Sequence, residues 1–299
     1  MLETLVVGAC LAVLAAAAWI DLKTGEVPEW CSLGIAMIVG APCLACAAYF
    51  WDLGYVFTPA LWGAVAFAVA YVVFYLGQWG GGDVKLLGGI GGLLGFLDAG
   101  GYSWPNDTFM YASIPPLLTY AVNMALLAGP YVILYTLLLG LGQPRVFPAF
   151  LERFRGRRTL FAFAFSIIPL VFAVYYGVFV LAWVYALVPL MVVAQSYMKT
   201  VEETLMTKTI KVSELKEWDI IAEDAVVDGK AVAPKGNIEG ITPEQLAVLK
   251  AYSLGGKFKD TIKTKWGVKF VPVLFLSLPA TIYAGNLLEL VFAILFQDH

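Results

Sequence analysis

Two aspartates are the residues of this sequence whose type and setting point most directly to chemistry. Asp21 ends a long apolar run near the N-terminus, and Asp83 follows three consecutive glycines, Gly80 to Gly82. Charged side chains at membrane depth are costly and are functional candidates by default. The two aspartates are far apart along the chain, so only the fold can bring them together.

A pair of aspartates can carry out acid–base hydrolysis. Two carboxyl groups in one site cannot both ionise cheaply, so they hold one proton between them. The charged member acts as general base on a water molecule, and the protonated member polarises a scissile carbonyl. This is the chemistry of aspartic proteases, and it requires neither a metal nor a cofactor.

Each aspartate also has a purely structural interpretation. Glycines allow unusual backbone angles ahead of a helix, where an aspartate is favoured as a cap and by the helix dipole. Asp83 would then be the N-cap of a helix. Asp21 would be a charged residue at the end of a helix whose side chain extends to the membrane interface. Residue spacing alone leaves both interpretations open.

The composition defines the class of protein. The 299 residues are 61% hydrophobic and 14% charged, against about 25% charged in soluble domains, and the mean hydropathy is +0.80. These values exclude a soluble globular enzyme, a disordered chain and a disulfide scaffold. The net charge of −3 argues against nucleic acid as a partner. His299 is the only histidine, so the sequence lacks the residues for Ser-His-Asp, Cys-His or His-metal chemistry.

The apolar runs predict an all-α polytopic membrane protein with about eight transmembrane helices, within a range of six to eight, because a bilayer core takes about 20 apolar residues per helix. The predicted spans are 3–20, 31–50, 57–78, 84–98, 109–141, 160–179, 181–198 and 269–296. The stretch 160–198 is too long for one crossing, and Gly177 is a candidate turn within it. With the N-terminus outside, eight spans place the basic loops, Asp21 and Asp83 on the cytoplasmic side.

We expect three parts along the chain. Residues 1–198 form a membrane domain, 199–267 a small soluble cytoplasmic α+β domain, and 268–299 a final transmembrane helix. The middle part has short apolar runs and a near balance of acids and lysines.

Local signals give the insert its predicted elements. Short strands are expected at 209–212, 219–222 and 225–227. Thr242 and Gln245 have the spacing of a capping box, with a proline at the first helical position, so a helix is expected to start there.

Two short motifs resemble those of a known family. Residues 80–86, Gly-Gly-Gly-Asp-Val-Lys-Leu, resemble the G-x-G-D-x-K-L signature of GxGD membrane aspartyl proteases. Residues 21–29, Asp-Leu-Lys-Thr-Gly-Glu-Val-Pro-Glu, resemble the pattern D-x-x-T-x-x-I-P, followed by Asn or Asp, of type IV prepilin peptidases, with departures at Val27 and Glu29. The resemblance covers residues 10–97. The charged insert before a last span is similar to that of archaeal preflagellin (prearchaellin) peptidases.

The resemblance implies an aspartyl endopeptidase that removes the short basic leader of prepilin or preflagellin precursors at the cytoplasmic face of the cell membrane. Asp21 and Asp83 would be its catalytic dyad, and Gly80 and Gly82 would shape the loop that delivers Asp83. Its partners would be these precursors and membrane lipids. Bacterial members often carry a Cys-rich zinc loop and also methylate the new N-terminus. This chain passes from Pro28 straight into its second span, so we predict a peptidase without methyltransferase activity.

Four charged residues near the aspartates have two interpretations each. Lys23 and Lys85 are either topological anchors or groups that tune the dyad or contact the substrate. Glu26 and Glu29 are either part of a solvated loop or groups that attract the basic leader of a substrate. The sequence does not decide between these roles.

Two further features concern packing. Glycines recur through residues 88–95 in G-x-x-x-G spacing, which permits close helix packing. We expect them to bring the fourth predicted span against the first, and so Asp83 toward Asp21. Asn123 is expected to make a helix–helix hydrogen bond rather than to bind a ligand.

Other functions compete with the leader peptidase. One is a presenilin-like protease that cuts inside a substrate helix, and another is a proton- or cation-coupled transporter that uses the two aspartates. Thr24 and Pro28 favour the leader peptidase over the first. A transporter would show related halves and place its aspartates near the midplane, whereas these lie near one face. The intact pair of aspartates argues against an inactive scaffold.

Overall fold

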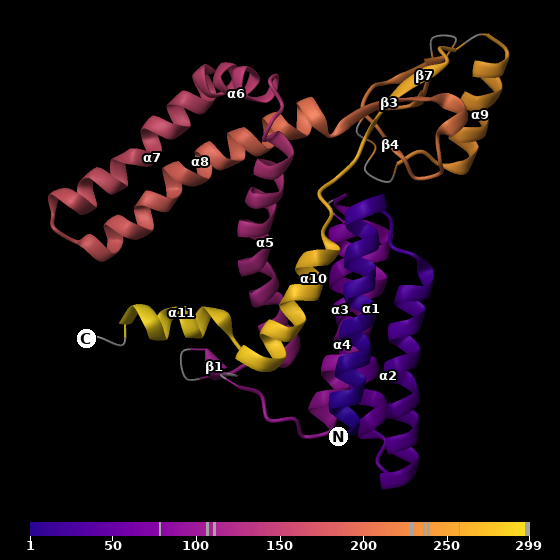
Figure 1. The fold of residues 1–299 in the computed structure, drawn as a ribbon, viewed down its shortest axis with the longest axis vertical. Helices are drawn as coiled ribbons and strands as arrows, with labels where there is room; N and C mark the ends of the chain where they lie inside the picture. Colours follow the sequence, from indigo (N-terminus) through magenta and orange to yellow (C-terminus); the bar gives the residue numbers. More distant parts are fainter. Residues whose placement is uncertain are drawn as a thin grey trace. The chain divides into compact units, whose positions relative to one another are not determined.

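The structure, a computed structural model, describes residues 1–77, 79–105, 108–109, 112–227, 230–235, 237, 240–256 and 258–296, so His299 lies outside the described residues. The chain divides into two compact units, Met1–Tyr131 with Val268–His299, and Val132–Gly267. Figure 1 shows the elements of both units, coloured along the sequence.

The first unit is built mainly from helices. Its elements are α1 (Leu2–Thr24), α2 (Glu29–Phe50), α3 (Gly54–Tyr75), α4 (Gly81–Ala99), the strands β1 (Thr108–Phe109) and β2 (Ala112–Ser113), the first part of α5 (Pro116–Gly140), α10 (Val271–Pro279), a π-helical turn (Ala280–Ala284) and α11 (Leu287–Phe296). Helices α1 to α4 run side by side (Figure 1). The core lies between α1, α2, α4 and α10, where Leu14, Ile35, Ile90 and Leu274 are fully buried.

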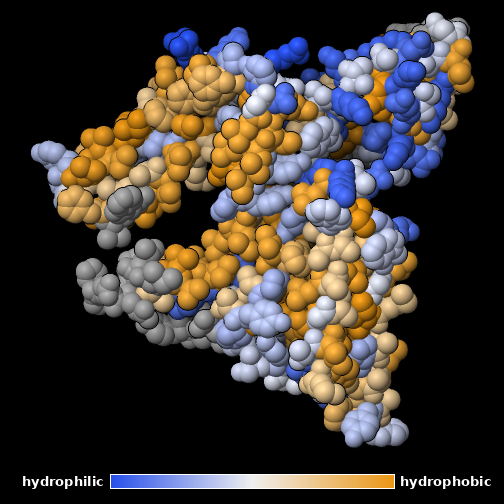
Figure 2. Space-filling view, viewed as in Figure 1, coloured by the Kyte–Doolittle hydropathy of each residue, from blue (hydrophilic) through white to orange (hydrophobic). Residues whose placement is uncertain are grey.

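The second unit combines helices with a small α+β fold. It holds the end of α5, α6 (Val146–Arg155), α7 (Arg157–Tyr175), α8 (Phe179–Leu205), β3 (Thr207–Lys211), a 3-10 turn (Val212–Glu214), β4 (Ile220–Ile221), β5 (Ala225–Val227), β6 (Lys230–Ala233), α9 (Pro243–Leu254) and β7 (Thr261–Lys265). The strands form an antiparallel sheet in the order β3-β7-β4 and a separate antiparallel pair of β5 with β6. Hydrophilic residues gather over this sheet and α9 (Figure 2).

The predicted elements of the α+β segment are confirmed. Strands occur at all three expected places, as β3, β4 and β5. Helix α9 starts as expected, because the Thr242 hydroxyl accepts from the Gln245 N–H at 3.3 Å and the Gln245 side chain accepts from the Thr242 N–H at 3.0 Å. Sequence reasoning missed β6 and β7, because β6 has only four residues and the lysines and threonines of β7 leave a single apolar residue in it. The boundaries proposed for the three domains stay a prediction.

The membrane class is confirmed. Six of the described helices are long and apolar enough to cross a membrane, namely α1, α2, α3, α5, α7 and the stretch Val184–Leu205 of α8, and a seventh is added if the bent pair α10–α11 counts as one span. Apolar side chains cover much of their outward surface (Figure 2). The division of residues 160–198 is also confirmed, because α7 and α8 are separated by a turn in which Gly177 has a φ of +70°.

Three predicted spans differ in detail. The helix expected over 109–141 begins at Pro116, after the β1–β2 pair. The last span, expected as one helix over 269–296, is broken and bends by 58° between α10 and α11, since a π-helical turn and Gly285, with a φ of +72°, interrupt it. Helix α4, expected as a span over 84–98, is not among the six, because its 19 residues include three charged ones, Asp83, Lys85 and Asp98.

The glycines of α4 pack against α2 and α3, which corrects the expectation that they bring α4 against the first helix. A Cβ atom on Gly91 would lie 2.5 Å from the Trp62 carbonyl oxygen of α3, and one on Gly89 would lie 2.7 Å from Cγ2 of Ile35 in α2. Neither position has room for a larger side chain. Glycine therefore permits this close approach, as the G-x-x-x-G spacing predicts.

Asn123 holds the broken last span, as the prediction of a helix–helix hydrogen bond requires. It is completely buried. Its Nδ2 donates to Thr281 Oγ1 at 3.0 Å and to the Gly285 carbonyl at 2.7 Å, and its Oδ1 accepts from the Leu287 N–H at 2.9 Å. One side chain thereby satisfies backbone groups that the break leaves without helical partners.

Replacing Asn123 by leucine should lower the free energy of unfolding in detergent by about 1–3 kcal/mol, because buried backbone groups lose their partners. The matched control is Thr136→Val. The Thr136 hydroxyl donates to the Val132 and Ile133 carbonyls of its own helix, which keep backbone partners, so its loss should cost less than about 1 kcal/mol. Equal losses in the two variants would contradict this role for Asn123.

Candidate active site

Asp21 lies in the last turn of α1, where α10 holds its carboxylate. Its side chain is buried, with 6% exposure. Oδ2 accepts a hydrogen bond from the Val271 N–H at 3.2 Å. Helix α1 ends immediately afterwards, since Gly25 adopts a left-handed conformation with a φ of 75° and its N–H donates to the Asp21 carbonyl at 2.8 Å. The first aspartate is thus positioned by the N-terminus of a helix that comes much later in the chain.

Asp83 lies in the first turn of α4. Its Oδ2 accepts from the Gly80 N–H at 3.0 Å, as the third residue of a capping box does. The structural interpretation of Asp83 as the N-cap itself is therefore corrected, because Gly80 is the N-cap. This hydrogen bond fixes the direction of the carboxyl group at the helix start.

The fold places the two aspartates in one unit, at the end of α1 and at the start of α4, and the charge of Asp21 acts on the carboxyl group of Asp83. Two carboxyl groups in such a setting favour one shared proton, which is the condition for one to act as base and the other as acid.

The two motifs touch through Gly82. A Cβ atom on Gly82 would lie 2.7 Å from Cβ of Val27, which belongs to the first motif. Gly80 differs, because its φ of −84° suits any residue and a Cβ there would meet Asp83 Oδ2 at an ordinary 3.6 Å. Close packing of the two motifs therefore requires glycine at position 82. The contacts of residue 80 do not require glycine there.

Thr24 ends the first motif helix and starts the link to α2. Its hydroxyl donates to the Ile20 carbonyl at 2.9 Å and accepts from the Glu26 N–H at 3.2 Å. Pro28 then has the extended conformation of an N-cap before α2. These contacts turn the chain within residues 25–28 and keep Asp21 at the end of α1.

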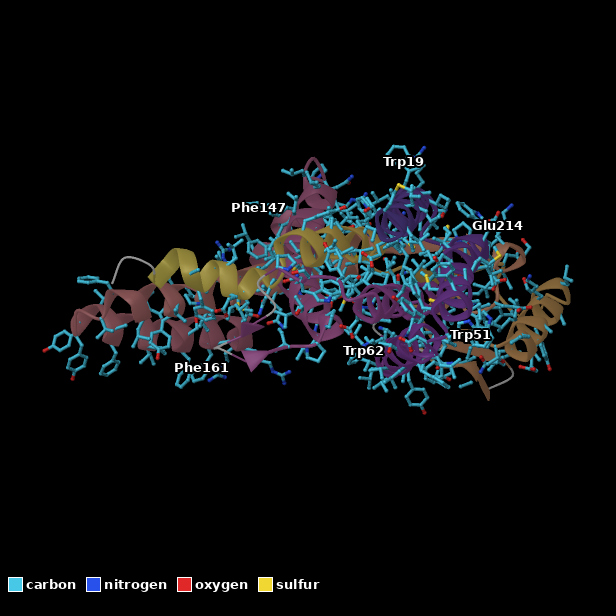
Figure 3. All side chains as sticks on the ribbon, turned by 90° about the horizontal axis from the view of Figure 1, so that it is seen from below. Trp19, Trp51, Trp62, Phe147, Phe161 and Glu214 are labelled. Atoms are coloured by element: carbon cyan, nitrogen blue, oxygen red, sulfur yellow. The ribbon has the colours of Figure 1, made fainter. Side chains whose placement is uncertain are left out.

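The charged neighbours of the dyad are engaged elsewhere or exposed. Lys85 pairs with Glu29 at 2.7 Å, in an ion pair that is open to solvent and therefore weak. Lys23 lies 4.4 Å from the ring centroid of Trp19, which projects outward from α1 (Figure 3). Glu26 is exposed. The structure thus places Glu29 and Lys85 together and turns Lys23 toward Trp19.

Sequence reasoning missed Lys269. Its Nζ donates to the Leu22 carbonyl at 2.8 Å, and its charge acts on Asp21. The ring of the next residue, Phe270, packs against that of Trp79 in a tilted arrangement, with ring centroids 5.4 Å apart. In the sequence, Lys269 is one of several basic residues ahead of the last span. The preference for basic residues on the cytoplasmic side already explains such a lysine, so nothing marked it as part of the site.

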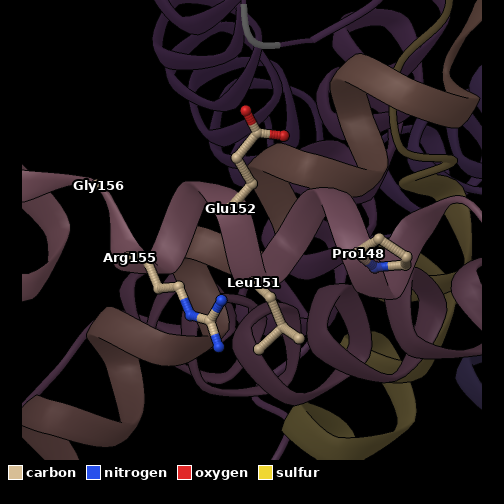
Figure 4. A pocket seen from close by; sticks show the side chains of 5 residues that line it. All are labelled: Pro148, Leu151, Glu152, Arg155 and Gly156. Carbon is tan, nitrogen blue, oxygen red and sulfur yellow. The ribbon is translucent and has the colours of Figure 1, made fainter.

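Cavities elsewhere contain none of the motif residues. One of about 430 Å³ opens beside α6, lined by Pro148, Leu151, Glu152, Arg155 and Gly156 (Figure 4). Another of about 500 Å³ lies between α7 and α8. Among the residues that the structure describes, no three His, Cys, Asp or Glu side chains are grouped so that they could hold a metal ion.

Comparisons with known proteins agree with the motifs. Residues 8–143 match the type IV leader peptidase family. The chain is 22% identical to the prepilin peptidase EppA of Methanothermobacter thermautotrophicus, in an alignment that covers 92% of this chain and 93% of that protein. No solved structure matches the chain. The family match includes Asp21 and Asp83, whereas Lys269 lies beyond it.

Replacing Gly82 by alanine should destabilise the protein by about 1–3 kcal/mol, because the new methyl group overlaps Val27. Gly81→Ala is the matched control, since a Cβ atom there meets nothing within 4 Å. Thermal unfolding in detergent compares the two. Equal stability of both variants would mean that the motifs do not pack as described.

Proposed function

Because residues 8–143 of this multi-pass membrane protein match the type IV leader peptidase family, we propose that it is an aspartyl endopeptidase that cleaves the leader of prepilin-like or preflagellin (prearchaellin) precursors. The observation that carries the proposal is the contact between the two motifs, in which Gly82 packs against Val27 while the charge of Asp21 acts on Asp83. A prepilin peptidase from an archaeon that aligns over nearly the whole chain supports the substrate class.

The mechanism follows from one proton shared by two carboxyl groups. The ionised aspartate takes a proton from water, whose oxygen attacks the scissile carbonyl carbon. The protonated aspartate donates a hydrogen bond to the carbonyl oxygen, where negative charge develops. The tetrahedral intermediate then breaks its C–N bond as the leaving amine takes a proton from the first aspartate. Buried carboxyl groups suit this step, because interactions with them are stronger than in water.

The substrate's basic leader would approach from the cytoplasmic side. Helices α2 and α3 are each long enough to cross the membrane, so the end of α1 and the start of α4, with Lys23 and Lys85, would lie at the same basic face. Glu26 and Glu29 are exposed acids beside the first motif, and we assign to them the attraction of the leader. Of the two roles expected of Lys23 and Lys85, we assign contact with the substrate backbone, because Lys85 pairs with Glu29 and Lys23 lies over Trp19 rather than on an aspartate.

The proposed activity stops at peptide cleavage. Helix α1 ends at Thr24 and α2 begins at Glu29, so the chain has no room between them for the Cys-rich loop of bacterial members that also methylate. Incubation of the purified protein with substrate and a methyl donor should leave the new N-terminus unmethylated. Methyl transfer would overturn this part of the proposal.

The test is cleavage of a leader-bearing prepilin or prearchaellin by the purified protein, read by mass spectrometry of the new N-terminus. Asp21→Asn and Asp83→Asn should each lose at least about 100-fold in kcat, because each removes one half of the acid–base pair. Asp98→Asn is the matched control. Asp98 also lies on α4, and its carboxylate accepts from Trp62 Nε1 at 3.4 Å, a role that asparagine can keep.

The outcomes separate the mechanism from the substrate. Cleavage by the wild type and by Asp98→Asn, but by neither dyad variant, supports the aspartyl mechanism. Cleavage by all four proteins would exclude it. A wild type that leaves every leader-bearing precursor intact would contradict the proposed substrate class.

A further inference from the structure

The segment that precedes α10 touches the first aspartate motif and the residue directly before the second. Building on the proposed function, we propose that Lys269 is a positioning residue that keeps Asp21 ionised, so that Asp21 serves as the general base and Asp83 as the proton-bearing acid. The motifs alone do not distinguish the two aspartates. The argument rests on contacts that each of them makes outside its own motif.

The ammonium group of Lys269 lies at the C-terminal end of α1. Its Nζ donates to the Leu22 carbonyl at 2.8 Å, and its Cε lies 3.8 Å from the position that a Cβ on Gly25 would take. The last carbonyls of a helix have no partners within it and form the negative end of its dipole. A lysine here is therefore held on the carbonyl of the residue next to Asp21, where its positive charge favours the ionised form of that aspartate.

The backbone of α10 adds a second interaction with Asp21. The Val271 N–H, in the first turn of α10, donates to Asp21 Oδ2 at 3.2 Å. Unpaired N–H groups and the positive end of a helix dipole favour a carboxylate over a carboxylic acid. Asp83 receives the comparable Gly80 N–H, but the cation whose charge acts on Asp21 makes the two sites unequal.

The other charged groups near Asp21 do not offset this asymmetry. From α2, Glu29 is engaged by Lys85. On α1 itself, Lys23 lies over Trp19. From α4, Asp83 is the like charge with which Asp21 interacts, and a neighbouring carboxylate of that kind favours protonation of one partner. The cation beside Asp21 makes Asp83 the partner that holds the proton.

The segment around Lys269 is itself anchored on two sides. The Tyr131 hydroxyl donates to the Lys269 carbonyl at 2.6 Å. The ring of Phe270 packs in a tilted arrangement against that of Trp79, the residue directly before Gly80. Movement of this segment would therefore affect the first motif through Lys269 and the second through Trp79. Such contacts position a charge accurately, as an active site requires.

The test compares kcat and KM for leader cleavage across a range of pH in Lys269→Met and Lys269→Arg. Loss of the cation makes Asp21 harder to ionise, so the acid limb of the kcat profile of Lys269→Met should move up by about one pH unit. On that limb its kcat should fall about tenfold, while KM changes little. Lys269→Arg keeps the charge and should restore the acid limb. Lys208→Met, which removes an exposed lysine of β3, is the matched control.

A second variant separates the loss of the positive charge from a folding defect caused by the substitution. Lys269→Cys can be assayed before and after alkylation with bromoethylamine, which rebuilds an ammonium group at this position on the same folded sample. The four native cysteines are buried, which limits their reaction. Alkylation should return the acid limb toward the wild-type pH.

The results distinguish this inference from the proposed function. If Asp21→Asn or Asp83→Asn still cleaves the leader, the proposed function fails. If both are inactive while Lys269→Met keeps the wild-type acid limb, the function stands and the role of Lys269 is wrong. A third outcome would also refute the role of Lys269. In it, the acid limb moves in Lys269→Met and stays displaced both in Lys269→Arg and after alkylation of Lys269→Cys, so the effect does not depend on the positive charge.

Discussion

The hydrogen bond between α10 and Asp21 constrains the whole site. A carboxyl group buried among apolar helices is costly unless it has hydrogen-bond partners. The Val271 N–H supplies one at 3.2 Å, and it is available because the first N–H groups of a helix have no partner within that helix. Helices α1 and α10 must therefore meet for Asp21 to be stable in its position. The place of α10 is as much a part of the site as the two motifs.

Close helix packing is the second requirement, and small residues make it possible. Glycines let α4 approach α2 and α3 so closely that Gly91 has no room for a methyl group. In a bilayer, where lipid tails are as apolar as leucine, such contacts rather than the hydrophobic effect hold helices together. Gly82 extends the same principle to the motifs, because its contact with Val27 brings the start of α4 to the loop after α1. Packing and catalysis thus depend on the same helix.

Polar side chains of α5 hold the segment that carries α10. The Tyr120 hydroxyl donates to the Leu274 carbonyl at 3.0 Å, and the Tyr131 hydroxyl donates to the Lys269 carbonyl at 2.6 Å. Asn123 satisfies the groups exposed by the break after α10. Irregular backbone at membrane depth is tolerated only where protein groups replace water as partners. These hydrogen bonds explain how a broken span can still present a well-placed N-terminus to Asp21.

The sequence by itself determined the membrane class, most helices, the turn at Gly177, the helix start at Thr242 and the two aspartate motifs. These features are local, because run length, capping chemistry and motif spacing act within a few residues. The break in the last span was missed because its apolar run is continuous, and the partners that allow the break come from α5. Only the tertiary structure joined Lys269 and α10 to Asp21. The Val271–Asp21 contact links residues 250 positions apart, and no local pattern specifies a partner at that distance.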